Sequence, residues 1–219
     1  DERIKAEYAW EIPMRMEEWL KKRGKTLKPD DLVTIDENEI KEFLSKFMEN
    51  KWPKRMKRKD REEWIEKISN SIKSACEKLI REYGGNADNL FKKYSENLSV
   101  PLVYLILRQF PGVGPKKASM IARDFACEKW SWFRGLKSRI QNLRITGKNL
   151  SEVSPDVHIK RVFARVGFLG KSLVPQDYQN FAKLMYPQNP GLVDSLFWKI
   201  GREYCDPRNS KCGSCPLVK

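Results

Sequence analysis

Two polar side chains, Lys116 and Asp156, stand where helices are expected to begin. Lys116 follows the run FPGVGP at residues 110–115, whose glycines and prolines end one helix and start another. Asp156 precedes the apolar-periodic residues 157–166 and is of a type favoured at a helix N-cap. An uncharged lysine amine is a nucleophile, and a nearby carboxylate stabilises positive charge that develops in a reaction. Together with the glycine-rich turn, the two residues predict a protein that binds a phosphate backbone and carries out chemistry beside it.

The turn before Lys116 is expected to bind an anion. Residues 99–109 predict one helix, with Ser99 as its N-cap, and residues 115–128 predict the next. Backbone N–H groups at the start of the second helix lack partners, and the helix dipole adds partial positive charge there. A DNA phosphate suits this position, although a corner that only packs is the alternative. The residues predicted to contact the phosphate are Gly112, Val113, Gly114 and Lys117.

Three segments of the sequence resemble one known superfamily. FPGVGPKKASMIA resembles the helix-hairpin-helix of the DNA glycosylases that include endonuclease III and the 8-oxoguanine glycosylases. PDVHIKRVFARVGF resembles their aspartate-bearing segment, and Cys205-x6-Cys212-x2-Cys215 resembles their iron–sulfur cluster loop. The three motifs occur in the family's order across residues 99–215, which makes the resemblance specific.

The resemblance implies a role for each matching residue. Lys116 matches the lysine whose amine attacks the sugar C1′ as the base leaves, forming a Schiff base that permits strand cleavage by β-elimination. Asp156 matches the carboxylate that supports this attack, and Arg161 is predicted to contact DNA. Two plainer interpretations stay open. Lys116 would only neutralise phosphate, and Asp156 would only cap its helix, although a cap is also a rigid mount for a catalytic carboxylate.

Three cysteines near the end of the sequence predict a metal centre. The resemblance implies that Cys205, Cys212 and Cys215 bind a [4Fe–4S] cluster, whose thiolate ligands converge on one centre. The family spacing places the fourth ligand at position 221, beyond Lys219. Zinc or no metal is the alternative. Five cysteines in a chain without a signal peptide favour a reducing cytosol over a disulfide framework.

The chain is expected to be all-α, because helical periodicity recurs and strand-like alternation is hard to find. The resemblance implies two helical subdomains with a DNA-binding cleft between them. Residues 1–50 with 168–219 would form one, including the cysteine loop, and residues 51–167 the other, including the hairpin and Asp156. The connection at residues 126–153 is longer than in close-packed relatives. Its aromatic and basic residues, among them Trp130, Trp132, Phe133 and Arg134, would line a pocket or pack.

The net charge favours a polyanionic partner, because 43 Lys and Arg against 29 Asp and Glu give +14. Basic residues with aromatics among them are dense at residues 52–59 and 130–148. These stretches fit phosphate binding and base stacking, or else are solvated helix faces whose tryptophans turn to the core. No segment predicts a membrane role. A monomer in a prokaryotic cytoplasm, associated with the nucleoid, is expected.

The sequence as a whole predicts a base-excision repair DNA glycosylase with AP-lyase activity. It would bind duplex DNA with a damaged base or an abasic site, flip the base out, and attack C1′ with Lys116. A monofunctional glycosylase is the first alternative. A non-catalytic helix-hairpin-helix DNA-binding protein is the second, and it would have no need of a carboxylate at Asp156. No motif indicates which base is removed.

Overall fold

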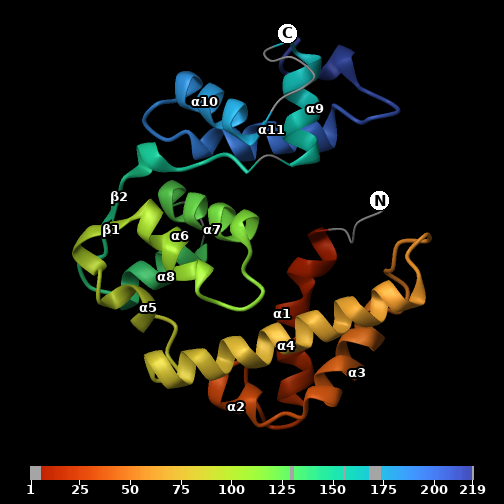
Figure 1. The fold of residues 1–219 in the computed structure, drawn as a ribbon, viewed down its shortest axis with the longest axis vertical. Helices are drawn as coiled ribbons and strands as arrows, with labels where there is room; N and C mark the ends of the chain where they lie inside the picture. Colours follow the sequence, from red (N-terminus) through yellow and green to blue (C-terminus); the bar gives the residue numbers. More distant parts are fainter. Residues whose placement is uncertain (1–5, 129–130, 155, 168–173, 219) are drawn as a thin grey trace. The chain divides into compact units, whose positions relative to one another are not determined.

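The structure is a computed structural model that describes residues 6–128, 131–154, 156–167 and 174–218 (Figure 1). The described residues are mostly helical, which confirms the expected all-α class. Two strands of two residues each, β1 (Leu98–Ser99) and β2 (Ile145–Thr146), pair in parallel. Within the described ranges, no helix is long and apolar enough to cross a membrane. The α-helices are α1 (Ala6–Lys21), α2 (Pro29–Val33), α3 (Glu37–Met48), α4 (Arg58–Tyr83), α5 (Asn89–Lys92), α6 (Val100–Arg108), α7 (Pro115–Cys127), α8 (Ser131–Arg139), α9 (Val157–Arg165), α10 (Pro175–Met185) and α11 (Gly191–Glu203).

The chain divides into two compact units. The first comprises Asp1–Leu90 and Phe110–Gly112, and the second comprises Phe91–Gln109 and Val113–Lys219. The boundaries of these units differ from those of the expected subdomains. Residues 51–90 group with the N-terminal helices because α4 packs along α2 and α3. The hairpin helices group with the C-terminal residues because α11 packs against both α7 and α9.

The first unit is built around the long helix α4 (Figure 1). Ile40 and Leu44 lie one turn apart on α3 and are fully buried together with Leu20 of α1. The turn at residues 110–112 belongs to this unit because Phe110 stacks on Tyr83 near the end of α4, with ring centroids 6.3 Å apart. The middle of the hairpin is thus packed on α4.

The second unit contains two helix pairs, α6 with α7 and α9 with α11. Aromatic side chains of α9, α10 and α11 form one hydrophobic core of this unit. The ring of Phe163 is fully buried, with centroid distances of 4.8 Å to Phe197, 5.3 Å to Phe181 and 5.6 Å to Tyr178. This packing fixes the direction in which α9 runs from Asp156.

The long connection at residues 126–153 contains α8, a helix that the sequence pattern did not indicate. Phe133 of α8 is buried, and its ring lies 5.4 Å from that of Phe125 on α7. Phe133 therefore packs, which decides between the two interpretations for this residue. Arg134 is exposed. Trp130 and the side chain of Trp132 lie outside the residues that the structure describes.

Candidate active site

The protein itself holds the turn of the hairpin in place. Arg108, the last residue of α6, donates a hydrogen bond to the carbonyl of Val113 at 2.9 Å. Gly112 has a φ of +76°, and a Cβ at this position would lie 2.6 Å from Oγ of Ser71 on α4. The conformation and the close approach to α4 both require glycine here. The predicted phosphate contacts of Gly112 and Val113 stay predictions.

The start of α7 is open. Gly114 is its N-cap, offers no side chain to the first turn, and a Cβ added to it would meet nothing within 4 Å. Pro115 occupies the beginning of the helix, as its sequence position predicts. Lys116 and Lys117 follow, and both are exposed. Among the described residues, no carboxylate pairs with the Lys116 amine. An open helix start beside two lysines suits an anion.

Asp156 is the N-cap of α9. Its Oδ1 accepts hydrogen bonds from the backbone N–H groups of His158, at 2.8 Å, and Ile159, at 3.1 Å. The predicted cap is therefore confirmed. Oδ2 of Asp156 accepts no hydrogen bond from the part of the chain that is described, and the residue is half-buried. One carboxylate oxygen is thus fixed by the cap, and the other is available to a ligand.

The segments that carry Lys116 and Asp156 meet within the second unit. Ser154 is buried, and its hydroxyl donates a hydrogen bond to the carbonyl of Lys116 at 3.4 Å. Ser154 precedes Asp156 by two residues. The first turn of α7 and the N-cap of α9 are therefore neighbours, although they are far apart in the sequence.

A buried ion pair supports this junction. Arg123 lies about two turns along α7 from Lys116, and its Nη1 donates to Oδ2 of Asp194 on α11 at 2.7 Å. The same Oδ2 accepts the backbone N–H of Ser154 at 3.1 Å. One carboxylate therefore joins α7, α11 and the segment that leads to Asp156.

The charges of this pair are set by burial and by each other. Burial raises the pKa of Asp194 above its ordinary value, although Arg123 and the N–H of Ser154 favour the carboxylate. Burial disfavours the charge on Arg123, but the carboxylates of Asp194 and Asp124 outweigh it and raise the pKa of Arg123. Removing one partner of such a pair is costly, so the pair holds its three segments in one arrangement.

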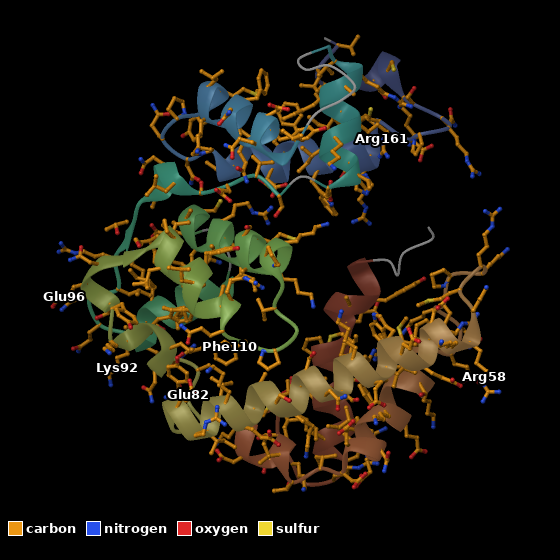
Figure 2. The ribbon with its side chains drawn as sticks, in the orientation of Figure 1. Arg58, Glu82, Lys92, Glu96, Phe110 and Arg161 are labelled. Carbon is orange, nitrogen blue, oxygen red and sulfur yellow. The ribbon has the colours of Figure 1, made fainter. Side chains whose placement is uncertain are left out.

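Arg161, on α9, is directed at the end of α11 (Figure 2). Its guanidinium donates to the carbonyls of Gly201, at 2.7 Å, and Cys205, and to Nδ1 of His158, at 2.9 Å. Because arginine can only donate, Nδ1 of His158 acts as an acceptor. A Cβ on Gly201 would lie 2.9 Å from the carbonyl oxygen of His158, so α9 and α11 are in close contact. A DNA contact of Arg161 stays a prediction.

The C-terminal cysteines lie around a loop that α9 holds. Arg165 donates through Nη1 to the carbonyl of Asp206 at 2.7 Å, and this nitrogen lies 3.6 Å from Sγ of Cys205. Cys215 is buried in the core with α9 and α11, whereas Cys212 is exposed. Over the described ranges, no three His, Cys, Asp or Glu side chains are grouped so as to hold a metal ion. The thiols as placed do not form a ligand set, and the [4Fe–4S] and zinc centres stay predictions.

Sequence patterns did not indicate the residues beneath the site, Arg123, Ser154 and Asp194. One signal was available: Asp194 lies beside Val193 and three residues before Phe197, both buried, so it falls on the apolar face of α11. A carboxylate in such a position needs a buried partner. The identity of the partner, 71 residues earlier in the chain, follows only from the fold.

Two of the solved structures with a similar fold are complexes of endonuclease III. Over 87% of this chain, the TM-score is 0.54 with 17% identity to a non-covalent endonuclease III–DNA complex, and 0.53 with 19% identity to a trapped endonuclease III–DNA covalent intermediate with an estranged adenine. The chain spans 66% of the length of each of these proteins. No protein-family model matches the sequence, and a search of curated protein sequences found no match. The chain has an endonuclease III-like fold, as the helix-hairpin-helix resemblance implied.

Proposed function

We propose that this chain is a DNA glycosylase with AP-lyase activity, acting on duplex DNA that contains a damaged base or an abasic site. The observation that carries the proposal is the junction at which Ser154, two residues before Asp156, binds the carbonyl of Lys116. A lysine at an open helix start and a carboxylate on a helix cap are thereby neighbours. The endonuclease III-like fold and the net charge of +14 support the same function.

DNA binding would use the start of α7. The backbone N–H groups of its first turn and the positive end of its dipole would bind one phosphate. Gly114 leaves this position uncovered, since a Cβ there would meet no other atom within 4 Å. Lys117 would add charge next to the phosphate. Arg108 would keep the turn in shape through its hydrogen bond to the Val113 carbonyl.

In the proposed reaction, Nζ of Lys116 attacks C1′ of the target nucleotide. The bond from C1′ to the base breaks, and the base leaves with the bonding electrons and takes up a proton. After the sugar ring opens, the nitrogen and C1′ form a Schiff base. Loss of a proton from C2′ then allows β-elimination, which breaks the C3′–oxygen bond and cuts the strand. Water finally releases the lysine.

Asp156 would stabilise the positive charge that develops on the sugar and support deprotonation of the amine. Its cap bonds to His158 and Ile159 hold the carboxylate in one orientation and leave Oδ2 for this role. The pair of Arg123 with Asp194 would hold the segments that carry Lys116 and Asp156 in a fixed relative position, because Asp194 also accepts the N–H of Ser154.

Borohydride trapping on a duplex with an abasic site tests the proposal. Wild-type protein and the Lys117→Ala variant are expected to give a covalent adduct, and Lys116→Ala is expected to give none. Lys117 is the matched control because it is the exposed neighbour on the same turn. An adduct of undiminished yield from Lys116→Ala would show that another residue is the nucleophile. No adduct from folded wild type that still binds the duplex would leave a monofunctional glycosylase or a non-catalytic binding protein.

A further inference from the structure

The turn between α3 and α4 carries a dense group of positive side chains that the proposed reaction does not use. Residues 51–61 contain seven Lys and Arg against one Asp. We infer that three of them, Lys54, Arg55 and Lys57, form a second contact surface for the phosphate backbone of duplex DNA, separate from the start of α7. These three residues are called the basic turn below. The inference rests on the proposed function, because it adds a contact with the same DNA.

The segment has a defined shape because its remaining aromatic and basic residues anchor it. Trp52 and Trp64 pack edge to face, with ring centroids 5.5 Å apart. Arg61 donates through Nε to a backbone carbonyl of the segment at 3.1 Å. The Lys51 amine lies 3.3 Å from the centre of the Phe47 ring. The tryptophans therefore serve packing, and the basic turn is presented on an ordered support.

The charges of the basic turn are exposed, and no carboxylate of the described residues pairs with them. The glutamates that follow on α4 are already engaged. Arg58 pairs with Glu62 at 2.7 Å, and Lys59 pairs with Glu63 at 3.7 Å. Figure 2 shows Arg58 extending outward from the first turn of α4. Three adjacent cations are thus left for an external anion.

Helix stability does not explain the charge of Lys57 at the start of α4. Lys57 is the N-cap of α4 without a capping side-chain bond, and Arg58 and Lys59 follow in its first turn. Positive side chains at a helix N-terminus face the positive end of the dipole, where acidic residues are the stabilising choice. The order of basic residue first and Glu four positions later is also the weaker one for ion pairs on a helix. Asp60 is the one acidic residue of this first turn, so the positive charge of Lys57 is not accounted for by the helix dipole.

The chemistry of the surface selects a backbone with closely spaced phosphates. Its three long side chains donate hydrogen bonds and accept none, so they fit several anionic groups near one another. Successive phosphates of a DNA strand meet this requirement. A membrane surface fits less well, because the described segment at residues 51–61 has no exposed large apolar side chain to insert.

The dependence of DNA affinity on salt tests the inference. The triple variant Lys54→Gln, Arg55→Gln, Lys57→Gln is compared with the control Lys21→Gln, Lys22→Gln, Lys28→Gln, which removes the same charge from other exposed positions of the first unit. Fluorescence anisotropy measures binding to an undamaged duplex and to the same duplex with an abasic site, at several KCl concentrations. Circular dichroism confirms that both variants are folded. Vesicles with anionic lipid form a further arm.

The slope of log K against log salt is expected to fall in magnitude by about 0.9 for each phosphate that the protein no longer neutralises, hence by about 2–3 for the basic-turn variant. The reduction should be equal on both duplexes, and the control should keep the wild-type slope. Equal slopes for the two triple variants, or vesicle binding that depends on the basic turn while DNA binding does not, would overturn the inference. Borohydride trapping separates this inference from the proposed function. If wild-type protein forms the trapped adduct but the basic-turn variant keeps the wild-type salt slope, only the second contact surface is refuted.

Discussion

The buried pair of Arg123 and Asp194 gives the sharpest prediction about stability. Their side chains are only 10% and 4% exposed, and Nη1 and Oδ2 are 2.7 Å apart. Two unit charges about 4 Å apart attract by about 4 kcal/mol at an effective dielectric constant near 20. Replacing Arg123 by Met removes this attraction and leaves the carboxylate buried, with the N–H of Ser154 as its remaining donor. The free energy of unfolding is expected to fall by about 3–5 kcal/mol.

A second substitution is expected to restore part of this loss. Asp194→Asn removes the buried charge but keeps an oxygen for the N–H of Ser154. The double variant Arg123→Met, Asp194→Asn should therefore be more stable than Arg123→Met alone, by about 2 kcal/mol. Asp194→Asn by itself should cost about 1–3 kcal/mol, because Arg123 keeps its bond to Asp124 but loses a charged partner.

Urea unfolding followed by circular dichroism measures all four free energies. The pH dependence gives an independent check. Burial raises the pKa of Asp194, so in Arg123→Met the folded state takes up a proton more readily than the unfolded chain, and the deficit should shrink as the pH falls through that raised pKa. If the double variant is instead less stable than Arg123→Met by the full cost of Asp194→Asn, the two side chains act independently. The account of a coupled buried pair would then be wrong.

Three further predictions concern other parts of the second unit. Burial would raise the pKa of Glu128, but Lys148 and Lys137 outweigh it and lower this pKa. Glu128→Gln should therefore reduce the free energy of unfolding by up to about 1 kcal/mol at neutral pH. In urea titrations, this difference from wild type should vanish as the pH falls through the lowered pKa. Gly201→Ala places a Cβ against backbone atoms and should destabilise by about 1–3 kcal/mol in the same assay, whereas an unchanged value would mean that α9 and α11 are not in close contact. If the cysteine loop binds a [4Fe–4S] cluster, purified protein should contain about four iron atoms per chain. This iron should be lost in Cys212→Ser and kept in Cys76→Ser. Wild-type protein without iron would contradict the predicted cluster.

Local sequence signals predicted the elements of the site well. Ser99 and Asp156 act as N-caps, and Pro115 begins α7, because these signals depend on a few neighbouring residues. The sequence pattern indicated no helix at residues 29–33 or 131–139, where α2 and α8 lie. Helix α2 has only five residues, which is too short for a periodic pattern. Helix α8 lies in a connection where aromatic and basic residues are interspersed, which obscures the helical period of its apolar residues.

The residues that join the elements could not be predicted in the same way. The partner of Asp194 is 71 residues away, and only the packing of α7 on α11 brings Arg123 to it. Gly112 illustrates a second limit. The sequence did not indicate that a Cβ at this position would meet Ser71 of α4, and the external phosphate contact of Gly112 stays a prediction. A glycine requirement can be read from a motif, whereas what it approaches is fixed by tertiary structure.

The packing of Phe110 on α4 has a consequence for any attempt to isolate the hairpin. The chain passes between the two units at three points, before Phe91, before Phe110 and before Val113, so no single proteolytic cut yields either unit as one continuous fragment. A fragment that begins at Phe91 would expose the ring of Phe110, which is only 9% accessible in the intact chain, at a cost of about 1.5–3 kcal/mol. Local opening of the end of α4 would release the same ring and loosen the turn ahead of Lys116. Hydrogen exchange at the turn of residues 110–112 should therefore rise and fall with hydrogen exchange at the end of α4, a helix that is separate from this turn in the sequence.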